Sequence, residues 1–174
     1  MTKPPQATHR PLSPRTHSFH TIYDADGKRK QAVDSKTARY IHGLGGELLA
    51  DANSTGVTKE YAYRNGDLLV TVTTKSPSDF RWLVKDHLGT PRIVADESGS
   101  LSAIKRHDYL PFGEEIGPTS FGRSTGQGYG NPQSDGVRQQ FTGYERDNES
   151  ELDFAQNRYY NSGHGRFTTT DPLL

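Results

Sequence analysis

The sequence predicts an all-β protein made of short antiparallel strands joined by tight hairpins. The first evidence is a series of turn glycines, Gly27, Gly45, Gly66 and Gly89, at intervals of 18, 21 and 23 residues. A spacing that recurs near 20 residues is typical of repeat architectures, in which each unit needs its neighbours to bury its apolar face. The segments between these glycines alternate polar and apolar side chains, as half-buried strands do.

The Asn65-Gly66 pair is the clearest local hairpin signal, because both central residues of a type I′ turn need a positive φ. In the strand before this turn, Tyr61 and Tyr63 share one face. After the turn, simple alternation predicts two faces, one with Leu68, Val70 and Val72 and the other with Leu69, Thr71 and Thr73.

Two further elements complete a strand-rich region that we place at residues 19–112. Phe80, Trp82 and Val84 share a face of the next predicted strand. The Ser98-Gly99 pair lies between runs rich in β-branched residues, so we expect a hairpin tip at residues 96–100.

The last third of the chain divides into a loop and an ordered end. Residues 113–140 are rich in Gly, Ser and Gln, which predicts a long irregular surface loop. Residues 141–174 regain aromatic and apolar side chains. Within them, residues 152–160 fit either one short helix, with Leu152, Ala155 and Tyr159 on one face, or a strand; the pattern leaves both open.

The composition limits the classes of function. With 174 residues, of which 30% are hydrophobic, the chain suits one domain with a thin supply of core side chains. The 21 basic residues balance the 21 acidic ones, so we expect no nucleic-acid partner. There are no cysteines, which excludes disulfides and thiolate metal sites. No apolar run approaches the roughly 18 residues of a membrane span.

Residues 1–18 are Pro-rich and basic and lack periodicity, which predicts a flexible tail. They contain no apolar segment of the kind that a secretory signal needs. The sequence by itself therefore assigns no cellular compartment.

Three segments together resemble a known family. "DHLGTPRIVADESGS", "YLPFGEE" and "FTGYERDNESELDFAQNRYYNSGHGRFTTTDP" resemble, in order and spacing, the C-terminal part of the Rhs repeat-associated core of bacterial Rhs/YD-repeat proteins. The upstream units around Tyr23, Tyr40 and Tyr63 are similar to degenerate YD repeats. The resemblance covers about residues 19–172.

The resemblance implies a fold and a role. In related proteins the repeats form a long β-sheet that spirals into a hollow shell, the shell encloses a C-terminal toxin, and the core region closes one end. Such proteins are secreted or lie on the cell surface. The implied partners of this chain are the remainder of a shell and a toxin domain, and free strand edges are a route to self-association.

Two departures from the family limit these expectations. About three repeats precede the core, where a full shell needs many. The sequence also ends at "TTTDPLL", before the second Asp-Pro-x-Gly motif at which relatives are cleaved. We therefore expect a fragment or an orphan gene product that is not an active enzyme by itself.

The resemblance also implies where self-cleavage chemistry belongs. Aspartyl self-cleavage needs a pair of carboxylates in different protonation states near a strained peptide, with a cation that tunes them. Arg166 and Asp171 occupy the family's "GRFTTTDP" positions and are the candidate catalytic residues. The structural alternative is that Asp171, before Pro172, is an extended turn residue and that Arg166 pairs with a neighbour.

Three hypotheses about function follow: a structural β-scaffold, a core that cleaves itself in cis, and a carbohydrate-binding surface that uses Tyr61 and Tyr63. No cofactor or metal is expected, because the seven histidines show no ligand spacing. The structural hypothesis assigns the chain reversals to Gly27, Gly45, Gly66, Gly89, Gly99 and Gly113.

Overall fold

The computed structural model describes residues 20–171 except 26, 34–36, 76, 78, 132–133 and 149. The predicted tail at residues 1–18 lies outside the described residues. Most of the described chain is a nine-stranded antiparallel sheet in which each strand pairs with the next along the sequence. Its strands are β1 (His20–Tyr23), β2 (Arg29–Val33), β3 (Ala38–His42), β4 (Leu48–Asn53), β5 (Gly56–Arg64), β6 (Asp67–Thr73), β7 (Asp79–Lys85), β8 (Pro91–Ala95) and β9 (Lys105–Arg106).

A second antiparallel sheet forms near the C-terminal end. Its four strands are β10 (Glu145–Asp147), β11 (Leu152–Ala155), β12 (Arg158–Asn161) and β13 (Arg166–Phe167). Residues 152–160, for which the sequence left helix and strand open, are therefore the hairpin of β11 and β12. Buried Asp153 pairs with buried Tyr160 across this hairpin. The fold is all-β, and the helical turns among the described residues are three short 3₁₀ segments, η1 (Leu101–Ala103), η2 (Thr125–Gln127) and η3 (Phe141–Gly143).

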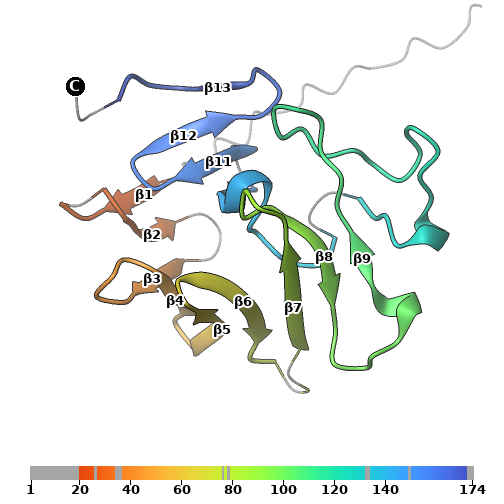
Figure 1. Cartoon of the computed structure of the whole chain (residues 1–174). Helices are drawn as coiled ribbons and strands as arrows, with labels where there is room; N and C mark the ends of the chain where they lie inside the picture. Colours follow the sequence, from red (N-terminus) through yellow and green to blue (C-terminus); the bar gives the residue numbers. More distant parts are fainter. Residues whose placement is uncertain are drawn as a thin grey trace, which may run out of the picture.

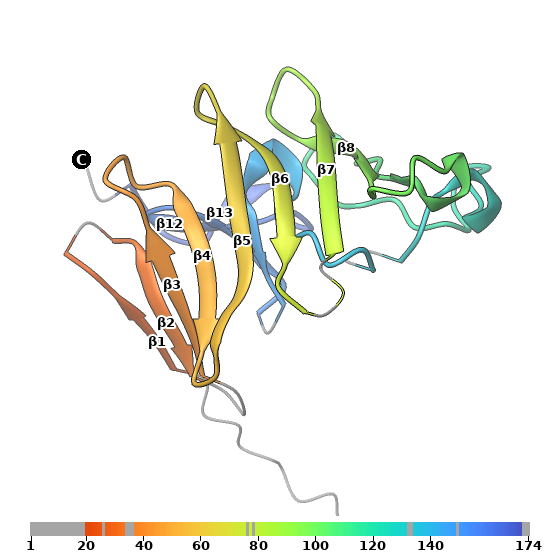
Figure 2. The same ribbon diagram turned by 90° about the horizontal axis from the view of Figure 1, so that it is seen from below.

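The nine-stranded sheet is curved, and the C-terminal segment lies on its inner side. Figure 1 shows the sheet bending from β1 through β5 to β8 around the blue C-terminal strands, and Figure 2 shows β1–β7 side by side with those strands behind them. The buried core cluster gathers on this inner face. It consists of Ala32, Tyr40, Leu48, Tyr61, Leu68, Leu83, Val94 and Val137. Val137, from the C-terminal segment, completes the core.

The β5–β6 hairpin forms at the predicted Asn-Gly turn, with φ of 53° at Asn65 and 85° at Gly66. At the β3–β4 turn the residue with positive φ is Gly46 (88°), next to the predicted Gly45. The other predicted turn glycines also have positive φ: Gly27, Gly89, Gly99 and Gly113.

The predicted faces of β6 are wrong in one respect, and a β-bulge is the reason. The register between β5 and β6 shifts at Ala62/Tyr63, so that Tyr63 pairs with Leu68 but Ala62 pairs with Val70. Leu69 is the extra residue, and it reverses the alternation. Leu68 therefore shares the inner face with Thr71, the partner of buried Tyr61. Val70 and Val72 lie on the opposite face of the sheet, where Val70 is still buried.

On β7, the outward face holds Phe80, Trp82 and Val84, which share a face as the alternation predicts. Trp82 pairs with Val70 and is 42% exposed, whereas Leu83 belongs to the inner core. The chain reverses after β8 as expected, but its returning arm starts with η1 and contains only the short β9.

Residues 113–140 differ from a simple surface loop. Their described part has no strand longer than an isolated bridge, yet Asp135, Val137 and Gln140 are buried. Polar contacts hold the segment in place. The carboxylate of Asp108 accepts hydrogen bonds from Arg92, Arg123 and Tyr129. No helix of the described chain is long and apolar enough to cross a membrane.

Candidate functional site

A cluster of charged and phenolic side chains joins the two sheets, and we call it the inter-sheet seam. The nine-stranded sheet contributes residues from the inner faces of four adjacent strands, and the C-terminal segment contributes the rest. The seam consists of Arg29 (β2), Tyr40 (β3), Asp51 (β4), Tyr61 (β5), Glu145 (β10) and Arg138, which precedes β10. It is the part of the molecule where residues distant in sequence meet.

Arg138 is the centre of the seam. Its Nη2 lies 3.0 Å and 2.9 Å from the two carboxylate oxygens of Asp51. The same nitrogen lies 2.8 Å from the Tyr61 hydroxyl and 3.0 Å from Oε1 of Glu145. Tyr61 in turn donates to Asp51 at 2.9 Å. One guanidinium therefore links β4 and β5 to β10.

Arg29 makes a second link from β2. Its Nη2 donates to Oε1 of Glu145 at 2.5 Å, and its guanidinium lies 4.3 Å from the centre of the Tyr40 ring. Arg29 is only 3% exposed. Two arginines thus share the Glu145 carboxylate inside the molecule.

Burial and ion pairing act against each other in the seam. Burial alone would lower the pKa of Arg138, but Glu145, Tyr61 and Asp51 raise it well above its usual value. Burial also raises the pKa of Asp51, and the nearby Arg138 only partly opposes this. Removing one member would leave its partners charged and dry, which is the costly case for a buried ion pair. The seam is therefore suited to holding the sheets in one arrangement.

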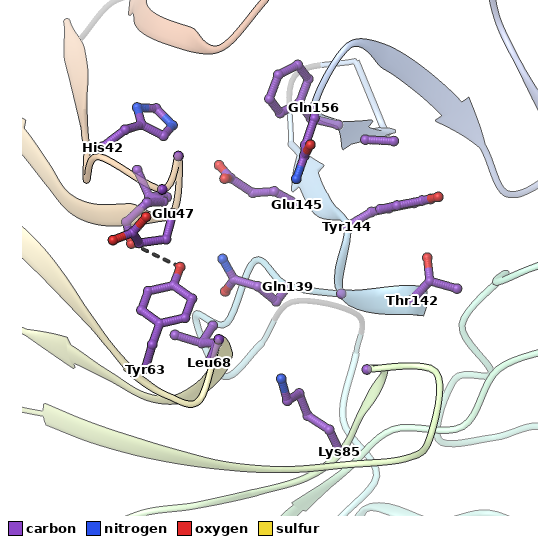
Figure 3. A pocket seen from close by; sticks show the side chains of 18 residues that line it. His42, Glu47, Tyr63, Leu68, Lys85, Gln139, Thr142, Tyr144, Glu145 and Gln156 are labelled. Atoms are coloured by element: carbon purple, nitrogen blue, oxygen red, sulfur yellow. Dashed lines mark hydrogen bonds between the residues drawn. The ribbon is translucent and has the colours of Figure 1, made fainter. Parts of the chain in front are cut away.

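Next to the seam lies a cavity of about 890 Å³ (Figure 3). One wall is formed by the ends of three hairpins of the large sheet, including His42, Glu47 and Tyr63, and the other by residues 139–145 and 154–156. Figure 3 shows Glu47 and Glu145 on opposite sides of this space. Tyr63 donates a hydrogen bond to the Leu48 carbonyl at 3.0 Å. No group of three or more His, Cys, Asp or Glu in the described chain could hold a metal ion.

The structure places the candidate catalytic residues at the end of the second sheet. Arg166 lies on β13 and is exposed. Asp171 forms an ion pair of 3.2 Å with Nη2 of Arg158 on β12. The guanidinium of Arg158 also lies 3.8 Å from the centre of the Phe167 ring. Sequence reasoning missed Arg158, although it opens the quoted "RYY" motif, because 13 residues separate it from Asp171.

The carbohydrate hypothesis requires exposed tyrosine rings, and Tyr61 does not provide one. Tyr61 is 5% exposed and its hydroxyl is engaged by Asp51 and Arg138, so its ring is not on an exposed surface. Tyr63 is half-buried beside the cavity. The physical reason is that both rings point to the inner face, which the C-terminal segment covers.

The geometry defines a class of fold: a curved antiparallel sheet whose inner face is closed by a small C-terminal sheet. The solved structures with a similar fold include two whose sequence identity to this chain is below 20%, so the similarity shows a common fold and nothing more. One is the Photorhabdus luminescens Tc holotoxin pore with a substitution in TccC3, with a TM-score of 0.60, 18% identity and 92% of this chain covered. The other is a crystal structure of TcdB2-TccC3-TEV, with a TM-score of 0.61, 19% identity and 93% covered.

The chain corresponds to only 8% of the length of each of those two chains. Neither a protein-family model nor a curated protein matches the sequence.

Proposed function

We propose that this chain is a β-scaffold unit of an Rhs-type shell that encloses a toxin polypeptide. The observation that carries the proposal is the fold shared with the two toxin structures over more than nine-tenths of the chain. The "DHLG", "PFGE" and "RYY" motifs support the same assignment independently, since they come from the sequence alone.

The physical features of the chain suit this role. The strand at one end of the large sheet, β1, pairs on one side only within the described residues, so its other edge offers backbone donors and acceptors to a further repeat. A unit that is closed by buried charges rather than by a thick apolar core can also border a water-filled interior.

The test is to tag the chain in its native gene and to purify the longer protein or complex that contains it. We expect cryo-electron microscopy to reveal a hollow β-walled particle, and limited proteolysis to spare a guest polypeptide until the wall is opened. Isolation of a free, compact 174-residue protein without other β-repeats would contradict the proposal.

One observation favours a second function, self-cleavage in cis. The Arg158–Asp171 ion pair offers one carboxylate and a tuning cation, which are two of the groups that aspartyl chemistry requires. If the native gene product is cleaved downstream of Asp171, Asp171→Asn should leave it uncut in intact-mass spectrometry. The control Asp67→Asn, at the exposed first residue of β6, should still be cut. Equal cleavage of both variants would eliminate this function.

A further inference from the structure

A second buried charge cluster lies apart from the inter-sheet seam. His107 follows β9 and is 6% exposed. Its Nδ1 is 2.6 Å from Oε1 of Glu115, and its Nε2 is 2.9 Å from Oδ2 of Asp135. The side chains of Glu115 and Asp135 are 6% and 0% exposed. We call these three residues the His107 latch.

With both carboxylates ionised, the geometry of the latch places a proton on each ring nitrogen. An ionised carboxylate can only accept hydrogen bonds, so both nitrogens of His107 must donate. A neutral imidazole has a single N–H and would turn a lone pair toward one carboxylate. Burial alone would lower the pKa of His107, but the hydrogen bonds to Asp135 and Glu115 raise it to about 9.

The other polar and charged side chains around the latch are engaged with other partners. Tyr109 lies beside both carboxylates and directs its hydroxyl to Gln140 at 3.3 Å. Lys59, on β5, donates to the Gly136 carbonyl. Arg92 is occupied by Asp108, and Arg146 by Asp153. Oε2 of Glu115 has no hydrogen-bond partner within the described chain. The imidazolium is therefore the cation in contact with both carboxylates.

The latch is connected directly to the inter-sheet seam. Oδ1 of Asp135 accepts a hydrogen bond of 2.9 Å from the Val137 amide. Val137 is 2% exposed in the inner core, and the following residue, Arg138, pairs with Asp51. Asp135 thus orients the stretch of chain that joins the C-terminal segment to the large sheet.

We propose that the His107 latch is a one-proton switch: loss of the proton from His107 in alkaline solution releases residues 134–137 from the nine-stranded sheet, while that sheet stays folded and Arg138 stays paired with Asp51. The inference concerns this chain alone and does not depend on the proposed shell role.

The direction of the switch follows from linkage. The pKa of His107 is about 9 in the folded chain, against 6.5 for a free histidine. The stabilisation is therefore fully present below pH 6.5, weakens between 6.5 and 9, and is lost above 9. The equilibrium constant for closing the latch should fall by about 300-fold across this range, as a pKa difference from 6.5 to about 9 implies.

The test combines two measurements on the full chain between pH 6 and 10.5. NMR of the His107 ring protons should show a titration near pH 9. Amide protection factors at residues 135–137 should fall with the same midpoint, while those of β5 and β6 stay unchanged. Asp135→Asn should lower both midpoints; if it does not fold, Glu115→Gln should do the same. His87→Gln, at an exposed turn, should change neither.

Three results would overturn the proposal. The first is a His107 titration near 6.5, its ordinary value. The second is a titration near pH 9 without loss of protection at residues 135–137. The third is simultaneous loss of protection in β5 and β6, which would mean global unfolding rather than a local release.

Discussion

At the scale of single residues, two glycines of the 113–140 segment have the same backbone geometry but different surroundings. The φ angles are 75° at Gly122 and 91° at Gly128. A Cβ added at Gly122 would meet no described atom within 4 Å, whereas one at Gly128 would lie 2.6 Å from the Ile104 carbonyl oxygen. Gly128 also accepts a hydrogen bond from the Arg106 amide at 2.9 Å. Substitutions at Gly122 and Gly128 therefore distinguish the cost of backbone strain from the cost of a steric clash.

We expect Gly122→Ala to lower the free energy of unfolding by about 1 kcal/mol, since it adds only the left-handed backbone penalty. Gly128→Ala should cost about 3 kcal/mol, because the backbone of residues 104–106 must also move. Urea denaturation measures both. Equal losses would show that the close approach of Gly128 to Ile104 is absent.

At the scale of elements, the bulge at Leu69 decides which side chains of β6 face the core. Simple alternation separates Leu68 from Thr71, but the extra residue brings them to the same inner face. Thr71 is consequently 0% exposed, and its Oγ1 has no hydrogen-bond partner within the described chain. A buried hydroxyl without a partner costs stability.

Thr71→Val should therefore raise the free energy of unfolding by about 1 kcal/mol, because it replaces that hydroxyl with a methyl group of similar size. Thr74→Val is the contrasting control: its hydroxyl, at an exposed site just after β6, donates a hydrogen bond to the Val57 carbonyl, so this variant should give no gain. Thermal melting of the two variants makes the comparison. A loss of stability in Thr71→Val would mean that Thr71 faces water, as unbroken alternation predicts.

At the scale of the whole molecule, the two sheets share buried charges and should unfold together. Trp82 on β7 reports on the large sheet, and far-ultraviolet circular dichroism reports on both sheets. We expect the two signals to give coincident urea transitions at pH 6, where the His107 latch is closed. Two separated transitions would show that the C-terminal sheet is an independent unit.

The local elements of this molecule could be predicted from sequence, but their assembly could not. The Asn65-Gly66 turn and the alternation in β5 and β7 carry local signals that depend on neighbouring residues. The bulge at Leu69 has no such signal, because it depends on how β5 and β6 pair. The seam joins Asp51 to Arg138 across 87 positions, and no spacing rule connects them. For the same reason Arg158 was missed as the partner of Asp171.

The central claim is that Arg138 docks the C-terminal segment onto the inner face of the large sheet through Asp51. A double-mutant cycle with Asp51→Ala, Arg138→Ala and the double variant tests it most directly. We predict a coupling of about 2 kcal/mol in the free energy of unfolding at pH 6, because Arg138→Ala takes the paired cation from Asp51, and Asp51→Ala takes one of two paired carboxylates from Arg138. Additive effects, with a coupling below about 0.5 kcal/mol, would contradict the docked arrangement.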